Sequence, residues 1–144
     1  MAGGRPEIYT SDIANAICTE IATSSRSLRT ICKQDKMPSV STILIWLRDK
    51  PEFLTQYTRA KEEQADFLVE EMLDISDDKT NDVISTETGE SGNSVAVSRA
   101  RLQVDTRKWL SSKLKPKKYG EKLDLGGSVE QIIRVKVQGE DDND

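Results

Sequence analysis

The sequence predicts a mainly α-helical protein that ends in one short β-strand. Three features predict this fold class. Apolar residues recur every three or four positions through most of the chain, which is the period of a helix. Prolines stand where such helices would begin or stop. Near the C-terminus the pattern changes to a two-residue alternation, which is the period of a strand.

The composition excludes several classes of protein. A chain of 144 residues can form one domain, or two small ones that share an oligomeric core. Hydrophobic residues make up 35% of the chain and charged residues 32%. This composition is typical of chains whose helices bury their apolar faces against other subunits. No run approaches the roughly 20 apolar residues that a membrane span needs, and the N-terminus lacks the apolar core of a signal peptide. We therefore expect no membrane contact.

The sequence gives little support to catalysis or metal binding. It contains no histidine, the commonest general base and zinc ligand, and no glycine-rich phosphate loop. Cys18 and Cys32 both lie in apolar-periodic segments. This placement favours reduced core residues of a cytoplasmic protein over a disulfide or a metal site. We therefore predict no catalytic residue, no metal site and no cofactor.

Three short helices are predicted in the N-terminal part, after a flexible arm over residues 1–8. Thr10 or Ser11 can cap the first helix, which ends near residue 25. The second covers residues 27–34. Pro38 and the residues before it then break the pattern, and Ser39 caps the third helix over residues 40–49.

Short helices around a tight break are typical of a helix-turn-helix unit, with residues 39–49 as the recognition helix. Its outward positions would be Ser41, Thr42, Ile45 and Arg48. The apolar Ile45 stands where a base-reading or phosphate-binding side chain is expected, which argues against strong DNA recognition by this helix. Nine basic residues against seven acidic ones in residues 1–62 leave a net charge of only +2. The alternative is a plain three-helix packing unit with a solvated polar face. The expected DNA-binding residues here are Arg5, Arg26, Arg29, Lys33, Lys36, Ser41, Thr42, Arg48 and Lys50.

A long helix follows over about residues 52–75, with Pro51 at its first position. A polar loop over residues 77–94 can hold a small hairpin, with strands at residues 83–86 and 87–90. A second long helix then runs from about residue 94 until Pro116 stops it. The two long helices predict an antiparallel helical hairpin for oligomerisation. The residues expected to bury their side chains there are Phe67, Leu68, Met72, Ile75, Leu102, Trp109 and Leu110.

Charge divides sharply between neighbouring segments. Residues 99–122 hold nine Lys or Arg against two acids, whereas residues 63–98 hold ten acids against one Lys. The basic segment can bind phosphates or pair with the acidic segment. We expect residues 99–113 to form a structural helix, with Leu102, Trp109 and Leu110 buried. Residues 115–122 are expected to stay free to meet DNA or another protein, which adds Lys117 and Lys118 to the DNA-binding residues.

The composition changes again after Lys122. Residues 123–128 form a linker, residues 129–138 alternate as a strand does, and residues 139–144 form an acidic tail. One strand is not stable alone, so this one needs the loop hairpin, another subunit or a partner protein. The predicted organisation is an arm (1–8), a helix-turn-helix domain (9–60), a helical hairpin (61–122) and a C-terminal strand with its tail (123–144).

Two motifs, VDTRKW at residues 104–109 and PKKYG at residues 116–120, resemble the signature of small terminase subunits of tailed bacteriophages. Other segments look like the same family: Gly4-Arg5-Pro6, residues 37–47 of the expected DNA-binding helices, and residues 61–71 of the long helix. The resemblance covers roughly residues 4–124.

This resemblance implies a non-catalytic subunit that recognises double-stranded viral DNA at the packaging site. It further implies a homo-oligomeric ring of about eight to eleven subunits, with central helices as its core and DNA-binding helices outside. Such a ring delivers DNA to the large terminase subunit, the ATPase and nuclease, and regulates it in the cytoplasm of the infected bacterium. The residues themselves also leave open a dimeric helix-turn-helix transcriptional regulator, or an interaction protein whose N-terminal helices bind protein.

Overall fold

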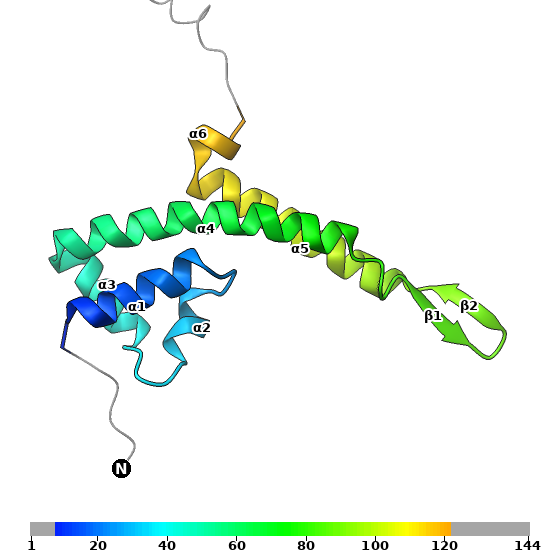
Figure 1. The fold of residues 1–144 in the computed structure, drawn as a ribbon, viewed down its shortest axis with the longest axis horizontal. Coiled ribbons are helices and arrows are strands. Elements are labelled where there is room, and N and C mark those ends of the chain that lie inside the picture. The colour runs from blue at the N-terminus through cyan, green and yellow to red at the C-terminus, as the bar shows by residue number, and fades with distance from the viewer. Residues whose placement is uncertain (1–7, 122–144) are drawn as a thin grey trace, which may run out of the picture.

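The computed structural model describes residues 8–121, which form six helices and one antiparallel sheet of two strands (Figure 1). This confirms the mainly helical class. Arg5 and the strand expected at residues 129–138 lie outside the described residues. None of the helices within residues 8–121 is long and apolar enough to cross a membrane. The elements are α1 (Ser11–Ala22), α2 (Leu28–Cys32), α3 (Val40–Asp49), α4 (Pro51–Asp77), β1 (Val83–Thr86), β2 (Gly89–Gly92), α5 (Ser94–Leu114) and α6 (Pro116–Tyr119).

Side-chain caps start the first three helices. The hydroxyls of Thr10, Ser27 and Ser39 each accept a hydrogen bond, at 3.2 Å, from the backbone N–H three residues further on. Such caps satisfy N–H groups that have no partner within the helix. The predicted caps at Thr10 and Ser39 are therefore confirmed. Helix α2 is shorter than expected, because the chain turns after Lys33 and reaches a positive φ of 64° at Lys36.

The core of the N-terminal part lies between α1, α2, α3 and the first half of α4. Phe53 is fully buried, and its ring centroid lies 5.8 Å from that of Trp46 and 6.0 Å from that of Tyr9, with both contacts edge-on. Edge-on aromatic contacts add to the stability that burial alone gives. Cys18 and Cys32 are buried in the same core and no disulfide joins them, as predicted.

Helices α4 and α5 lie side by side and run in opposite directions. An ion pair of 2.7 Å joins Glu71 of α4 to Arg107 of α5, and one of 2.8 Å joins Asp66 to Lys115. Because the earlier residue of α4 pairs with the later residue of α5, the helices must be antiparallel. Ser111, which is 2% exposed, allows the backbones to approach closely.

Helix α4 leaves part of the apolar surface of α5 uncovered. Leu102 and Trp109, expected to be buried in the oligomer, are 55% and 61% exposed within the chain, so their burial between chains stays a prediction. The seven-residue spacing that joins Val95, Leu102 and Trp109 selects a different side of the helix from Arg107 and Ser111. The less exposed side of α5 consists of Ala96, Ala100, Val104, Arg107, Leu110, Ser111 and Leu114.

One carboxylate holds α6 against α4. Asp66 accepts hydrogen bonds from Lys115 Nζ at 2.8 Å, Lys118 Nζ at 3.0 Å and the Tyr119 hydroxyl at 2.6 Å. These bonds hold the pKa of Asp66 well below its ordinary value of 3.8. Pro116 ends α5 as predicted. Lys118, expected to meet DNA or another protein, forms a surface ion pair with Asp66 while remaining 57% exposed, so its expected contact stays a prediction.

Strands β1 and β2 form a small hairpin that extends beyond the end of the α4–α5 pair (Figure 1). The first strand matches its prediction, whereas the second begins two residues later than expected because Glu87 and Thr88 form the turn. Gly89, which follows this turn, has φ of +128°, a conformation that favours glycine.

The Phe53→Ala variant should lose about 3 kcal/mol of unfolding free energy, because the removed ring leaves a cavity in a close-packed core. Urea denaturation followed by circular dichroism measures the loss. Leu54→Ala is the matched control: Leu54 is 48% exposed, so its variant should lose less than about 0.5 kcal/mol. A loss below about 1 kcal/mol for Phe53→Ala would contradict the core described above.

Asp66→Asn should destabilise the chain at neutral pH by only about 1 kcal/mol, since the side chain is 40% exposed and water screens its bonds. A carboxylate whose pKa is lower in the folded than in the unfolded state stabilises the folded chain at pH values above its unfolded-state pKa. This stabilisation is lost as the pH falls toward the folded-state pKa. The difference from wild type should therefore shrink as the pH falls from about 5 to 3. Denaturation of wild type and Asp66→Asn across this pH range measures that difference. Asp74→Asn is the matched control at neutral pH: Asp74 is an exposed residue of α4 that forms no ion pair with a described residue, so its variant should destabilise the chain less than Asp66→Asn does.

Candidate nucleic-acid interface

Helix α3 presents one side outward, beginning at its cap Ser39. Ile43 and Trp46 face the core, whereas Leu44 is 56% and Ile45 is 47% exposed. Ser41 and Arg48, also exposed, complete this side. We call the four residues Ser41, Leu44, Ile45 and Arg48 the α3 stripe.

The sequence interpretation included three members of the α3 stripe and omitted Leu44. Leu44 follows Ser41 by three residues and precedes Arg48 by four, which is helical spacing that could have identified it. Thr42, which was expected to face outward, is only half-exposed, and its hydroxyl lies 2.9 Å from that of Ser39. Thr42 therefore supports the cap of α3.

Three basic residues lie near the turn between α2 and α3. Arg29 belongs to α2, Lys33 follows its last turn, and Lys36 occupies the turn itself at positive φ. All three are exposed, and none forms an ion pair with a described residue. They are the basic side chains of this part that are most available to an external anion.

Other expected DNA-binding residues already have partners. Arg48 donates to both carboxylate oxygens of Asp49, at 2.8 and 3.2 Å, and this bond lowers the pKa of Asp49. Arg26 pairs with Glu20 at 3.4 Å. The Lys50 ammonium lies 4.5 Å from the centre of the Tyr9 ring. All of these contacts are at the surface, where ion pairs are weak and can be exchanged for another anion.

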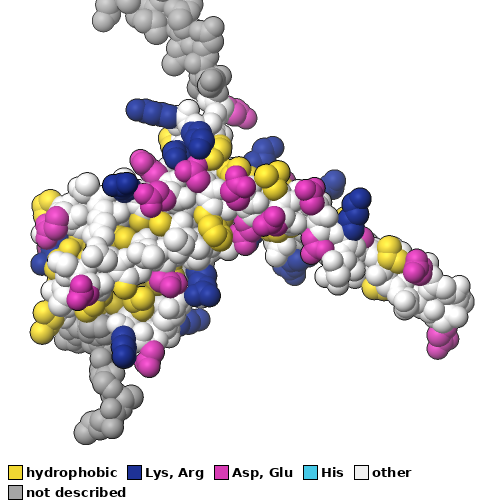
Figure 2. Space-filling model, in the orientation of Figure 1, with side chains coloured by type: hydrophobic (Ala, Val, Ile, Leu, Met, Phe, Trp, Pro, Cys, Tyr) yellow, Lys and Arg dark blue, Asp and Glu magenta, His cyan; other side chains and the backbone are white. Residues whose placement is uncertain are grey.

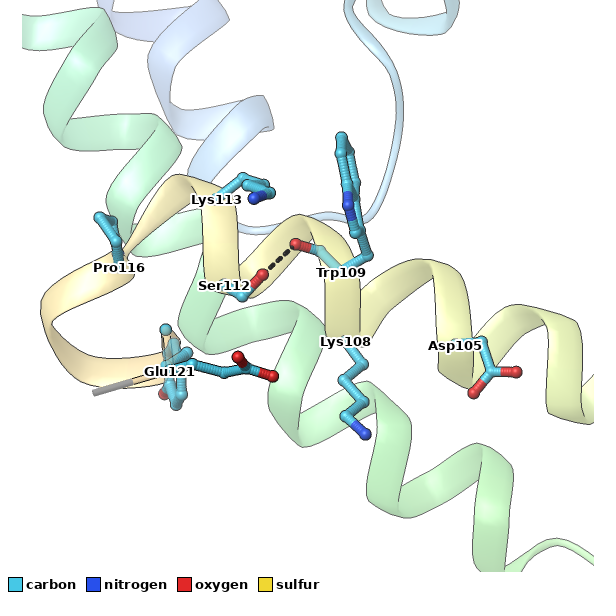
Figure 3. Close-up of a pocket in the computed structure, with 9 residues that line it drawn as sticks. Asp105, Lys108, Trp109, Ser112, Lys113, Pro116 and Glu121 are labelled. Carbon is cyan, nitrogen blue, oxygen red and sulfur yellow. Dashed lines mark hydrogen bonds between the residues drawn. The ribbon is translucent and has the colours of Figure 1, made fainter. Parts of the chain in front are cut away.

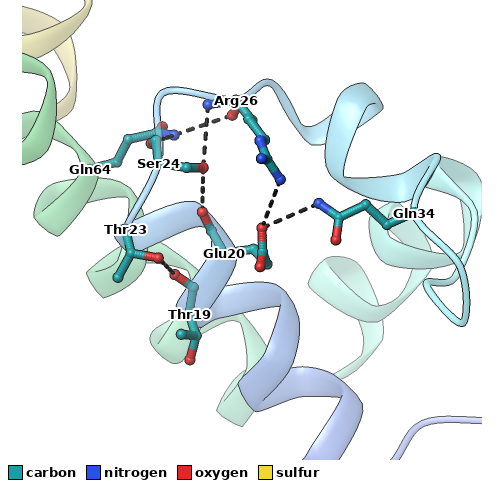
Figure 4. Close-up of polar contacts among 7 residues, drawn as sticks. All are labelled: Thr19, Glu20, Thr23, Ser24, Arg26, Gln34 and Gln64. Atoms are coloured by element: carbon teal, nitrogen blue, oxygen red, sulfur yellow. Dashed lines mark hydrogen bonds and ion pairs between the residues drawn. The ribbon is translucent and has the colours of Figure 1, made fainter. Parts of the chain in front are cut away.

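Polar contacts fix the α1–α2 loop to the long helices. The Gln64 amide, only 5% exposed, donates to the carbonyls of Ser24 at 3.0 Å and Arg26 at 3.3 Å (Figure 4). Ser25 donates to one oxygen of Glu71, whose other oxygen accepts from Arg107. The loop is thereby joined to α4 and, through Glu71, to α5. The sequence interpretation missed these roles, because the residues are about 40 positions apart in sequence.

Lys117 and Lys118 are not brought together with the other expected DNA-binding residues. They belong to α6, which lies on the opposite side of α4 from α1, α2 and α3 (Figure 1). Lys118 is bonded to Asp66, whereas Lys117 is exposed. A ligand at the α3 stripe would therefore have to be large, or shared between several chains, to meet both groups.

An open groove of about 780 Å³ lies where α5 meets α6. Its apolar part includes Trp109, Pro116 and Tyr119, and Figure 3 shows the indole of Trp109 standing out from α5. Lys113 places its ammonium 5.8 Å from the indole centre. The groove also carries Asp105, Lys108 and Glu121. Charges of both signs around an exposed aromatic suit a protein surface better than a phosphate.

Within residues 8–121 no three Asp, Glu, Cys or His side chains come together as metal ligands would. On the face shown in Figure 2, acidic side chains gather along α4, and basic ones lie scattered over several elements.

Comparisons with known proteins agree with the overall fold. Residues 9–126 match the model of a family described as bacteriophage Sf6, terminase small subunit-like. Among solved structures, the chain is similar to crystal structures of three variants of the terminase small subunit gp1 of the bacterial virus Sf6. Their sequence identities are 35%, 34% and 35%, their TM-scores are 0.67, 0.66 and 0.67, and each alignment covers 82% of both chains. No curated protein matches the chain.

Proposed function

The chain belongs to the bacteriophage Sf6 terminase small subunit-like family, and we propose that it recognises double-stranded viral DNA at the packaging site. Membership of this family makes it a phage DNA-packaging subunit. The observation that carries the DNA proposal is the α3 stripe, with the free basic residues Arg29, Lys33 and Lys36 nearby. We assign it no catalytic step of its own, and place its work in the cytoplasm of the infected bacterium.

We propose that α2 and α3 act as a helix-turn-helix unit within residues 9–60. In such units the second helix enters the major groove, and nearby basic side chains contact backbone phosphates. Arg29, Lys33 and Lys36 suit the phosphate role, and Arg26, Arg48 and Lys50 can join them once their weak surface contacts are exchanged. With a net charge of only +2 in residues 1–62, a single copy would bind weakly. Several copies acting together would bind through avidity.

A ring built from residues 61–122 would supply those copies. The side chains of Phe67, Leu102 and Trp109 are 38%, 55% and 61% exposed within the chain, and exposed apolar surface of this kind favours a protein partner. Met72, Ile75 and Leu110 are half-buried and can contribute at the edges, whereas Leu68 is already buried by its own chain. Acidic α4 and basic α5 present complementary charge, as a heterologous interface repeated by rotation requires.

The ring would deliver DNA to the large terminase subunit and regulate it. Lys117 supports such a contact, because it is exposed on α6 beside the groove at Trp109. DNA is the other partner that suits this lysine. The competing proposal, a dimeric transcriptional regulator, would use the same α3 stripe but would need two-fold assembly.

Lys33→Glu and Arg29→Glu should each weaken the retention of duplex DNA on filters, because each removes a phosphate contact. The slope of log affinity against log salt should fall by about 1 for each phosphate that the variant no longer neutralises. Lys79→Glu is the control: it makes the same charge change at an exposed residue of the α4–β1 loop. Equal effects of Lys79→Glu and Lys33→Glu would show that only net charge matters, contrary to the proposed interface.

Native mass spectrometry of the full chain should show a closed assembly of about eight or more subunits. The double variant Leu102→Asp, Trp109→Asp should give smaller species with unchanged helical content, because both side chains are exposed within one chain but would be buried between chains. Leu54→Asp, at an exposed leucine near the start of α4, should leave the subunit count unchanged. A wild-type dimer would instead favour the regulator.

A further inference from the structure

We infer that Leu44 and Ile45 read the 5-methyl groups of thymine in the major groove, so that preferred DNA sites carry thymine opposite α3. This inference rests on the proposed function and deepens it by naming the chemical feature of DNA that is recognised. It begins from an unusual property of the α3 stripe. Its two central members are apolar, and both are about half-exposed.

An apolar side chain in the major groove has few partners. Leucine and isoleucine can neither donate nor accept hydrogen bonds, so they cannot read the amino, carbonyl or ring-nitrogen groups of a base. The 5-methyl group of thymine is the one apolar feature on the major-groove edges of the four bases. Because α3 holds Leu44 and Ile45 at adjacent positions on its outer side, they form one contact surface.

Arg48 does not offset this apolar character. An arginine reads guanine through two parallel N–H groups, but Nε and one terminal nitrogen of Arg48 are both directed at Asp49, and once this surface pair is exchanged Arg48 takes the phosphate role proposed above. Ser41, the remaining member of the α3 stripe, is short and accepts several bases. Contacts with thymine methyl groups are therefore the strongest source of discrimination that this helix offers.

The surrounding charge favours DNA over protein as the occupant. Arg29, Lys33 and Lys36 are exposed and form no ion pair with a described residue, so their charge is available to phosphates. Lys33 and Lys36 lie in the turn that leads into the helix carrying the apolar pair, and Arg29 lies on α2 just before it. An apolar centre with a basic margin matches thymine methyl groups bordered by the phosphate backbone.

The test replaces thymine by deoxyuridine, which lacks the methyl group but keeps the same hydrogen-bonding edge. Duplexes retained by the full chain are first selected from a randomised library, then prepared with either base. Wild type should bind the deoxyuridine duplex about fourfold more weakly for each methyl group removed from the interface, as expected for one buried apolar carbon. The salt slope should not change, because the phosphate contacts remain.

Variants locate the effect on α3. Ile45→Ala and Leu44→Ala should bind the thymine duplex more weakly and discriminate less between the two duplexes. Both residues are half-exposed, so thermal melting should confirm that the variants stay folded. Leu54→Ala, which removes a leucine of similar exposure from α4, should discriminate as wild type does.

Three results would overturn the inference. Equal binding of both duplexes by wild type would do so but would leave the proposed function standing, provided that Lys33→Glu still weakens retention. A lower subunit count for Ile45→Ala with full thymine preference would make the apolar pair a protein interface. Failure of wild type to retain any duplex would reject the proposed function as well.

Discussion

Two carboxylates on α4 hold the other parts of this molecule in place. Asp66 binds Lys115, Lys118 and Tyr119, and so fixes the end of α5 and the whole of α6. Glu71 lies between Ser25 in the α1–α2 loop and Arg107 on α5. Both act from partly exposed positions, where one bond contributes little. Each carboxylate nevertheless accepts more than one bond, and the rigid helix α4 holds it in place. Because the acceptor is already ordered, binding each further partner side chain costs less conformational entropy.

Helix α4 therefore belongs to two units at once. Its first half completes the aromatic core around Phe53, and its second half packs along α5. The buried amide of Gln64 lies between these regions: its nitrogen donates to two backbone carbonyls of the α1–α2 loop, and its oxygen accepts from Lys61 of α4. The bonds to the carbonyls depend on the path of the chain rather than on the side chains of the loop. The orientation of the three short helices is thus set by the same helix that pairs with α5.

Local signals in the sequence predicted where the helices begin and end. Thr10, Ser39, Pro51 and Pro116 act within a few residues of themselves, so their effect can be read without knowing the fold. Within the candidate interface, the same periodicity predicted that Ser41, Ile45 and Arg48 face outward.

Interactions over long separations could not be predicted in this way. A seven-residue spacing correctly placed Leu102 and Trp109 on one stripe of α5, but it does not say which element covers that stripe. Likewise, no local pattern indicates that Lys118 bonds to a carboxylate 52 positions earlier. The hydrogen bonds of Gln64 to the α1–α2 loop could not be predicted for the same reason, since the path of that loop depends on the packing of α1 and α2.

The length of α4 has a mechanical consequence. Twenty-seven residues make a rod of about 40 Å. A tilt of about 5° at one end moves the other by about 3.5 Å, close to the rise of one base pair. If α3 binds a duplex as proposed, the stiffness of this rod determines how accurately a movement at α5 is transmitted to the position of α3 along that duplex.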